Sequence, residues 1–206
     1  SPADIGRVLA AAYRKGLVKP VAGEEGSYLV LGPSRASFSS VFTHTAASGL
    51  EPRSLVRQVE ILPANAEMAE KLEVAPDSPV YRYARTRFVN EEALANQINY
   101  MPLEVCPGLE HDDVTRTSFQ KLLENKYATV FAGMKERFAI VEANEEDCEI
   151  LGLAACSTIL LIERVALSAT NRPVVWANIR IRPDRYSYVA ALWPEAAELL
   201  APGADE

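Results

Sequence analysis

The chain has 206 residues, of which 49% are hydrophobic and 24% charged, and its formal net charge is −7. This composition excludes a disordered polyelectrolyte and a protein that is basic throughout, because the chain can bury a sizeable core and is acidic overall. Residues 1–35 hold five Lys or Arg residues against three acids, so any contact with nucleic acid is expected at that end.

The N-terminal stretch has the pattern of the second half of a winged helix. Ser1 can cap a helix, Pro2 suits the first helical position, and Asp4 closes a capping box. Apolar residues at helical spacing continue to Gly16, and two short strands around a glycine-containing tip are expected next. One helix and two strands cannot bury their apolar faces alone, so we expect that the chain lacks its natural beginning and that 1–32 is a partial DNA-binding domain.

A second, larger domain is expected after a linker. The linker of turn-forming residues, the second domain and a mobile acidic tail are predicted at 33–41, 42–201 and 202–206. Thr43 or Thr45 is suited to cap a short helix that Gly49 ends. The free amides at such a helix start can bind an anion, and an ordinary helix cap is the alternative.

Two similar segments make up most of the second domain. Residues 80–102 alternate aromatic or branched residues with polar ones and have a polar turn at 90–92, which predicts a β-hairpin. A weaker copy follows about 80 residues later, and each hairpin comes after a short predicted helix, at 64–72 and at 145–151. The predicted fold class is therefore α+β, with one antiparallel sheet built from two helix-plus-hairpin repeats.

Paired arginines distinguish the first hairpin from its copy. Arg85 and Arg87 share one face of a strand with two tyrosines, whereas the copy keeps Arg164 and has Ala166 in place of the second arginine. Unpaired charge at the edge of a core is costly, so these guanidinium groups require an anion. That anion is either a bound ligand or a carboxylate of the protein, with Glu163 as a candidate partner for Arg85 or Arg164.

The sequence predicts no cofactor, metal site or catalytic residue. Three cysteines without a C-x-x-C spacing favour a reducing, intracellular compartment, and the absence of a signal-peptide pattern or a long apolar run places the protein in the cytoplasm. His44 and His111 are too few for a metal site, and the loop at 111–113 is expected to be solvated. The sequence also lacks the nucleophile-elbow, phosphate-loop, dinucleotide-binding and zinc-protease motifs.

Several stretches together resemble a known family of transcription regulators. Residues 5–30 resemble the recognition helix and wing of GntR-type winged-helix regulators. Residues 42–188 resemble the effector-binding UTRA domain of the HutC subfamily, whose fold is chorismate-lyase-like. The motifs that carry the resemblance include Gly49-Leu50-Glu51-Pro52-Arg53-Ser54, Arg85-x-Arg87, Tyr100-Met101-Pro102, Pro107-Gly108-Leu109, Ile162-Glu163-Arg164-Val165 and Asp184-Arg185-Tyr186.

The resemblance implies a homodimeric regulator that binds operator DNA and a small anionic metabolite. The effector contacts that it implies lie on the arginine strand and its neighbour, in the loop before the first helix and at the start of the middle helix: Arg85, Arg87, Gln97, Phe42, Thr43, His44 and Ser118. The DNA contacts that it implies are Ser1, Asp4, Arg7, Lys19 and Gly26. Phosphosugar-sensing relatives have a glutamate where this chain has Gln97, so a flatter, more apolar acid fits as well as a phosphosugar.

Two other functions stay open at this point. The same fold and an arginine pair also suit a chorismate-lyase-like enzyme that acts on a small carboxylic acid. A sensor that has lost DNA binding is the third hypothesis, because Gly6 replaces an expected arginine and Glu24 and Glu25 would repel the phosphate backbone.

Overall fold

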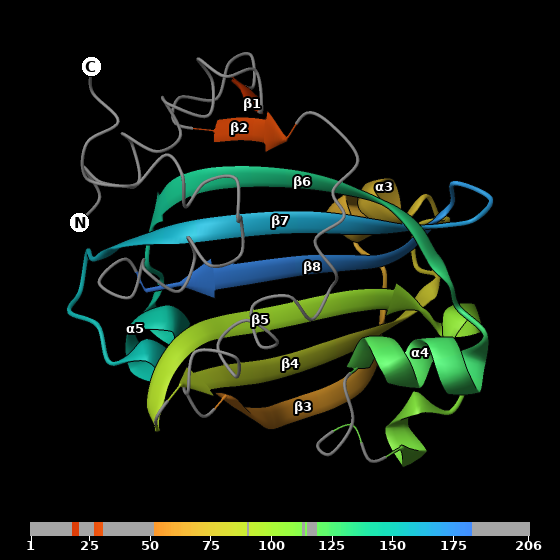
Figure 1. Ribbon diagram of the computed structural model, residues 1–206, viewed down its shortest axis with the longest axis horizontal. Coiled ribbons are helices and arrows are strands. Elements are labelled where there is room, and N and C mark those ends of the chain that lie inside the picture. The colour runs from red at the N-terminus through yellow and green to blue at the C-terminus, as the bar shows by residue number, and fades with distance from the viewer. Residues whose placement is uncertain are drawn as a thin grey trace, which may run out of the picture.

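The structure, a computed structural model, describes residues 18–20, 27–30, 52–89, 91–112, 114 and 119–182. Within these ranges, one antiparallel sheet has the strand order β1-β2-β6-β7-β8-β5-β4-β3 (Figure 1). The strands are β1 (Val18–Pro20), β2 (Ser27–Val30), β3 (Pro52–Pro63), β4 (Pro79–Val89), β5 (Glu92–Pro102), β6 (Phe131–Glu142), β7 (Thr158–Ser168) and β8 (Pro173–Ile181). The helices are α3 (Ala66–Leu72), α4 (Phe119–Tyr127) and α5 (Glu145–Leu151), with 3-10 turns η1 (Leu103–Val105) and η2 (Leu109–His111).

Two copies of one unit form most of this sheet. The first unit is β3, α3, β4 and β5, and the second is β6, α5, β7 and β8. Their last strands, β5 and β8, pair with each other between the two units, with Ala95 opposite Ile181 and Tyr100 opposite Trp176. The predicted α+β fold with an antiparallel sheet of two helix-plus-hairpin repeats is thus confirmed for the described residues.

The two repeats also agree in their backbone conformation. Asn65 and Asn144 cap α3 and α5, and each side chain accepts a hydrogen bond from the backbone N–H three residues later. Both helices end at a residue in the left-handed region, Glu73 with φ 53° and Gly152 with φ 63°. In each repeat, the backbone N–H of the alanine before the N-cap donates to the carbonyl oxygen of the serine just before the next strand. This bond measures 2.8 Å from Ala64 to Ser78 and 2.7 Å from Ala143 to Ser157.

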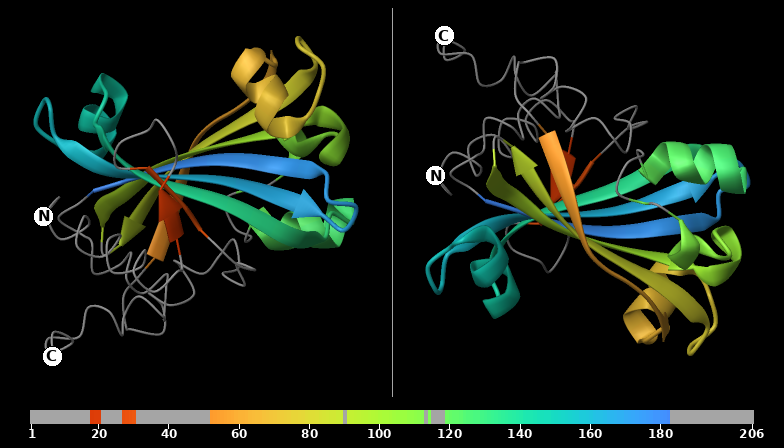
Figure 2. Two further views of the ribbon diagram at one scale, coloured as in Figure 1. Left: turned by 90° about the horizontal axis from the view of Figure 1, so that it is seen from above. Right: turned by 90° about the horizontal axis from the view of Figure 1, so that it is seen from below.

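The helices cover opposite faces of the twisted sheet. Figure 2 shows α3 and α5 on one face and α4 on the other. On the first face, α3 packs over Val80 and Trp176. The larger core lies on the α4 face, where Phe119 and Leu123 of α4 pack against Tyr83 and neighbouring apolar side chains of the sheet. Because side chains alternate along a strand, β3, β4, β5, β7 and β8 each contribute to both of these layers.

The N-terminal strands join the same sheet. β1 pairs with β2, as predicted for the two short strands, and β2 also pairs with β6, with Tyr28 opposite Phe138. The other N-terminal elements, the linker, the helix expected after Thr43, the closing strand and the tail lie outside the described residues. The predicted domain boundaries therefore stay predictions.

Candidate functional site

Two arginines of β4 lie side by side on the α4 face and share one acceptor. Nε of Arg85 and Nε of Arg87 each donate a hydrogen bond of 3.1 Å to Oε1 of Gln97 on β5. Nη1 of Arg87 also donates to Oγ of Ser54 on β3, at 2.8 Å. The register of the sheet brings these groups together, because Gln97 lies opposite Arg85 and Ser54 lies opposite Arg87. The structure thus assembles a compact polar cluster from three adjacent strands.

Aromatic rings form one side of this cluster. Cζ of Arg85 lies 5.3 Å from the ring centroid of Tyr83 and 5.9 Å from that of Phe119, the first residue of α4. The centroids of the two rings are 4.8 Å apart, so the rings form a continuous apolar surface beside the guanidinium group. Such contacts favour a cation only modestly and do not neutralise its charge.

The cluster is electrostatically unfavourable for positive charge. Burial lowers the pKa of Arg85, of which only 3% is exposed. Burial also lowers the pKa of Arg87 well below its ordinary value, and the positive charges of Arg85 and Arg164 contribute to the same shift. A guanidinium group nevertheless keeps its proton in proteins, so the lowered pKa values mean that negative charge would be strongly favoured here.

Arg85 makes no ion pair with any carboxylate of the described residues. Its described hydrogen bond ends on the neutral amide of Gln97, and among the described residues the titratable group that acts on its pKa, after burial, is the hydroxyl of Tyr83. Of the two predicted anions, a bound ligand or a carboxylate of the protein, the part of the chain that the structure describes thus provides no carboxylate for Arg85.

The corresponding arginine of the second repeat has an internal partner. Nε of Arg164 donates to Oε1 of Glu136 on β6 at 2.5 Å, and both side chains are buried. The prediction that Glu163 pairs with Arg85 or Arg164 is wrong: Glu163 forms an ion pair with Arg137 instead. The physical reason is that Glu163 and Arg164 are consecutive in β7, so their side chains point to opposite faces.

Comparison with known proteins identifies the domain that carries this cluster. The UTRA domain family matches residues 47–187, which is more than half of the chain. The chain belongs to the UTRA-domain family. This match confirms the resemblance to UTRA domains that the sequence indicates.

The relatives of this UTRA domain are named as transcription regulators. The uncharacterized HTH-type transcriptional regulator YurK of Bacillus subtilis is 22% identical over 142 residues, which cover 69% of this chain and 59% of YurK. The HTH-type transcriptional regulator GmuR of the same organism is 28% identical over 134 residues, which cover 65% of this chain and 56% of GmuR. The match therefore spans between half and two thirds of the length of these relatives.

Solved structures share the fold of this UTRA domain. The effector domain of PhnF from Mycobacterium smegmatis superposes with a TM-score of 0.64 at 18% identity, over 68% of this chain and 86% of that one. A putative transcriptional regulator from Streptomyces coelicolor is 30% identical, with a TM-score of 0.59 over 66% of this chain and 90% of that one. The two-repeat sheet is thus a known arrangement.

Several predicted site residues of the UTRA domain and the N-terminal part cannot be placed. The predicted effector contacts outside the described residues are Phe42, Thr43, His44 and Ser118. Of the predicted DNA contacts, Ser1, Asp4, Arg7 and Gly26 lie outside them, and Lys19 is placed only by its backbone in β1, opposite Leu29. Of the predicted effector contacts, the structure brings together Arg85, Arg87 and Gln97.

Sequence reasoning missed two members of the cluster. Asn99 accepts a hydrogen bond of 2.9 Å from Nε2 of Gln97 and is fully buried. The spacing of two between Gln97 and Asn99 is a signal that could have placed both on the arginine face. Ser54 could not have been assigned, because its contact with Arg87 depends on how β3 pairs with β4, and hairpin length does not fix that register.

The reverse face of the UTRA sheet carries a second polar network directly behind Gln97. Oδ1 of Asn96 accepts from Nη2 of Arg57 at 2.6 Å, and its Nδ2 donates to Oδ1 of Asp147 in α5 at 3.0 Å. Nε of Arg180 donates to the other carboxylate oxygen of Asp147 at 2.5 Å. Asn96 and Gln97 are consecutive in β5, so this one strand contacts the arginine cluster on one face of the sheet and α5 on the other.

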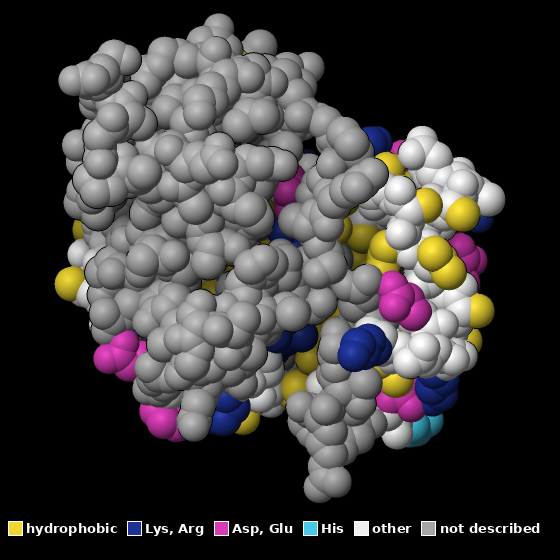
Figure 3. Space-filling model, in the orientation of Figure 1, with side chains coloured by type: hydrophobic (Ala, Val, Ile, Leu, Met, Phe, Trp, Pro, Cys, Tyr) yellow, Lys and Arg dark blue, Asp and Glu magenta, His cyan; other side chains and the backbone are white. Residues whose placement is uncertain are grey.

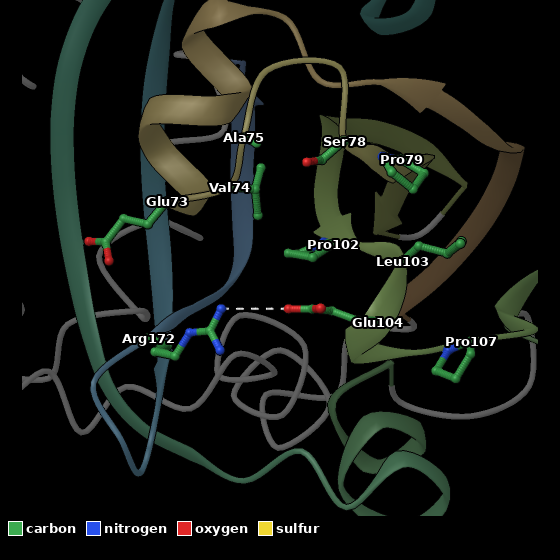
Figure 4. A pocket seen from close by; sticks show the side chains of 10 residues that line it. All are labelled: Glu73, Val74, Ala75, Ser78, Pro79, Pro102, Leu103, Glu104, Pro107 and Arg172. Carbon is green, nitrogen blue, oxygen red and sulfur yellow. Dashed lines mark ion pairs between the residues drawn. The ribbon is translucent and has the colours of Figure 1, made fainter.

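A groove of about 500 Å³ lies away from the arginine cluster, near the C-terminal end of β5 (Figure 4). It is lined by Glu73, Val74, Ala75, Ser78, Pro79, Pro102, Leu103, Glu104, Pro107 and Arg172. Its two labelled ion-pair partners, Arg172 and Glu104, are 3.6 Å apart and 67% and 71% exposed. These charges are solvated and already face each other, so the groove is a weaker candidate for anion binding than the buried arginines.

The described residues form no basic patch on the face that Figure 3 presents, and no metal centre is found among them. Figure 3 shows acidic, basic and hydrophobic side chains intermixed where described residues are visible. His111 is exposed, and Asp112 accepts hydrogen bonds from Lys126 and Tyr127. Among the residues that the structure describes, no group of three His, Cys, Asp or Glu side chains could hold a metal ion. None of the helices in these ranges is long and apolar enough to cross a membrane.

Proposed function

We propose that the chain is the effector-binding part, with a portion of the DNA-binding domain, of a GntR-type transcription regulator of the HutC subfamily. A small anionic metabolite binds at Arg85 and Arg87 and changes the affinity of the protein for operator DNA. The observation that carries this proposal is the buried Arg85, whose described partners are a neutral amide and two aromatic rings. A buried cation with such partners is stabilised by a bound anion.

The ligand is a small acid held against an apolar surface. The rings of Tyr83 and Phe119 lie beside Arg85, so an acid with a flat apolar part can pack there while its anionic group meets the guanidinium. Phe42, Thr43, His44 and Ser118 complete the site in this proposal, at a loop and a helix start whose amides suit an anion.

DNA binding belongs to the N-terminal part. Residues 1–32 form the recognition helix and wing, with Ser1, Asp4, Arg7, Lys19 and Gly26 at the DNA. The regulator is a cytoplasmic homodimer, so that two winged helices meet the two half-sites of an operator. The effector acts by binding one arrangement of the dimer more tightly than the other, because a ligand with equal affinity for both would shift nothing.

The test measures anion binding and DNA binding on the same full-length regulator. Carboxylic acids and phosphates are screened for an increase in the midpoint of thermal unfolding, and each hit is added to a fluorescence anisotropy titration with DNA from upstream of the regulator's own gene. We expect at least one hit to change DNA affinity, and Arg87→Ala to abolish that change.

Arg82→Ala is the matched control. Arg82 is also in β4 but points to the other face, where its Nη1 donates to Gln58 and Glu60. This variant should keep the anion response. If no acid or phosphate changes the DNA affinity of the wild-type protein, the proposed regulation is wrong, and a protein that binds an anion but no DNA would instead be a sensor that acts through protein contacts. The enzyme hypothesis is not proposed, because the relatives described above are named as regulators.

A further inference from the structure

The first part of β3 makes side-chain contacts on both faces of the sheet. On the arginine face, Oγ of Ser54 accepts a hydrogen bond from Nη1 of Arg87 at 2.8 Å. On the reverse face, Nη1 of Arg57 donates to Oε1 of Glu146 in α5 at 2.8 Å, and its Nη2 donates to Oδ1 of Asn96 in β5 at 2.6 Å. Ser54 and Arg57 are three residues apart in one strand, so a shift of this strand end changes both sets of contacts.

Two register shifts separate the start of β3 from the middle of the sheet. The pairing of β3 with β4 skips Arg57, because the residues on either side of it lie opposite consecutive residues of β4. A second shift lies between Arg87 and Phe88, where β4 pairs with β5. Bulges interrupt the ladder, bend the strand and redirect the side chain of the extra residue. Residues 52–56 can therefore move relative to the second half of β3.

Helix α5 provides a fixed anchor for Arg57. The carboxylate of Asp147 in α5 is fully buried, where it accepts from Nε of Arg180 at 2.5 Å and from the backbone N–H of Asn144 at 3.2 Å. It also accepts from Nδ2 of Asn96 at 3.0 Å. An ionised carboxylate can only accept, so the amide of Asn96 is fixed with Nδ2 toward α5 and Oδ1 toward Arg57. The acceptors for Arg57 are thus held in place before Arg57 meets them.

The placement of Arg57 is kept at a cost in stability. Only 24% of its side chain is exposed, and its Nε–H is buried without an acceptor among the residues that the structure describes. A buried donor without a partner costs free energy, because it gives up its hydrogen bonds to water. Stabilisation of the sheet alone therefore does not account for the geometry of this side chain.

The start of β3 is also the point at which the N-terminal part joins this half of the sheet. Residues 31–51 connect β2 to β3, and α5 lies at the same end of the sheet as the start of β3 (Figure 1). Arg182, which follows β8, contacts α5 at this end as well, because its Nη1 donates to the backbone carbonyl oxygen of Leu151 at 3.0 Å. A change in the position of the start of β3 therefore acts directly on the chain that leads to residues 1–32.

We infer that Arg57 is a positioning residue of the regulator, which couples the anion site at Arg87 to DNA binding by holding the start of β3 against α5. This inference rests on the proposed function and deepens it. An anion at Arg87 binds the same guanidinium group that holds Ser54, so it acts on the position of the start of β3. Coupling requires an element with two arrangements that both ligands favour unequally, and the start of β3 is that element.

Three variants of the full-length regulator test this role. Arg57→Met keeps the length of the side chain but removes its contacts with α5 and β5. Glu146→Ala removes only the partly exposed carboxylate of α5, and it serves as the second test if Arg57→Met does not fold. Arg82→Met is the matched control, because Arg82 lies on the same face and contacts Gln58 and Glu60 of β3 beyond the bulge.

Anion binding and DNA binding are measured separately for each protein. Isothermal titration calorimetry gives the Kd for inorganic phosphate and for benzoate, or for the hit of the screen described above if neither binds. Fluorescence anisotropy gives the Kd for DNA from upstream of the regulator's own gene, without the anion and with a saturating concentration of it. The ratio of the two DNA constants is the coupling factor. Hydrogen–deuterium exchange of peptides from the start of β3 reports on the strand itself.

The expected result is a split between anion affinity and DNA response. Arg57→Met should bind the anion with a Kd within about threefold of wild type, while its coupling factor falls below about twofold. Glu146→Ala should lower the coupling factor less, and Arg82→Met should keep the wild-type factor. The anion should change hydrogen exchange at the start of β3 in wild type and in Arg82→Met but not in Arg57→Met, because there the strand end is already released.

The outcomes separate the two proposals. If no anion changes the DNA affinity of the wild type, the proposed function fails and the role of Arg57 fails with it. If the wild type responds and Arg57→Met responds equally, or if Arg82→Met also loses the response, only the role of Arg57 is wrong. A loss of anion affinity beyond about tenfold in Arg57→Met would also overturn it, because Arg57 would then act on the anion site itself. If Arg57→Met does not fold, an unchanged coupling factor in Glu146→Ala overturns the inference.

Discussion

The two repeats place an arginine at the same point of the same strand but surround it differently. Arg85 of β4 has Val56 and Gln97 as its cross-strand neighbours, whereas Arg164 of β7 has Glu136 and Ala177. The second repeat therefore pairs its buried cation with a carboxylate of the protein, whereas the described cross-strand neighbours of Arg85 are neutral. The two repeats thus share their helix caps and hairpins but differ in the side chains that adjacent strands place beside the arginine.

The largest expected effect comes from making the second repeat resemble the first. Glu136→Gln leaves Arg164 buried beside a neutral amide, as Arg85 is now. Breaking a buried ion pair costs about 3–5 kcal/mol, so the free energy of unfolding should fall by that amount in a urea titration. Glu142→Gln, an exposed change at the end of the same strand, should alter it by less than about 0.5 kcal/mol. A small loss in Glu136→Gln would mean that the two repeats tolerate buried positive charge equally well.

Removal of the arginine should destabilise the second repeat much more than the first. Arg164→Met leaves Glu136 as a buried charge without this partner and should cost about 3 kcal/mol. Arg85→Met removes a cation that has no internal carboxylate among the described residues, so anion-free stability should change by less than about 1 kcal/mol. The stabilisation by an added anion should disappear only in Arg85→Met. Equal losses of stability in both variants, measured by urea unfolding, would contradict the difference in charge balance.

These contrasts also show how far the sequence alone leads. Strand alternation and the offset between the repeats correctly placed Arg85 and Arg87 on one face and Arg164 at the matching position. The partners could not be predicted in the same way, because pairing between non-consecutive strands depends on bulges and register. A bulge between Val56 and Gln58 lets Arg57 reach Asn96 on the reverse face.

The capping residues provide a smaller test of the same comparison. Both helices end in the left-handed region, but the first repeat has Glu73 where the second has Gly152. A side chain in this conformation strains the backbone, so Glu73→Gly should raise the free energy of unfolding by about 0.5–1 kcal/mol. Gly152→Glu should lower it by about 1 kcal/mol from backbone strain alone, since a Cβ atom there would meet no atom within 4 Å. Urea titrations of both variants and of the double exchange measure these effects, and changes of the same sign would contradict the prediction.

The smallest expected effect concerns pH and the connection between the repeats. The hydroxyl of Tyr81 in β4 donates to the carboxylate of Glu110 in η2 and accepts from the backbone N–H of Gly108. The hydrogen bond from Tyr81 lowers the pKa of Glu110, and burial together with Glu110 raises the pKa of Tyr81 to about 12. The contribution of Glu110 is thus present above its unfolded pKa of about 4.3 and is lost as the pH falls through its lowered, folded-state pKa.

Tyr81 gives the opposite dependence at high pH. Its contribution is full below its unfolded pKa of about 10 and is lost as the pH rises toward the folded-state pKa of about 12. Tyr81→Phe should therefore flatten both the acid and the alkaline limbs of a plot of unfolding temperature against pH. The alkaline limb should be reduced rather than abolished, because burial also raises the pKa of the Cys106 thiol to about 12 and this group still titrates. If Tyr81→Phe leaves both limbs unchanged, the η2 segment between the repeats is not held to β4 by this hydrogen bond in solution.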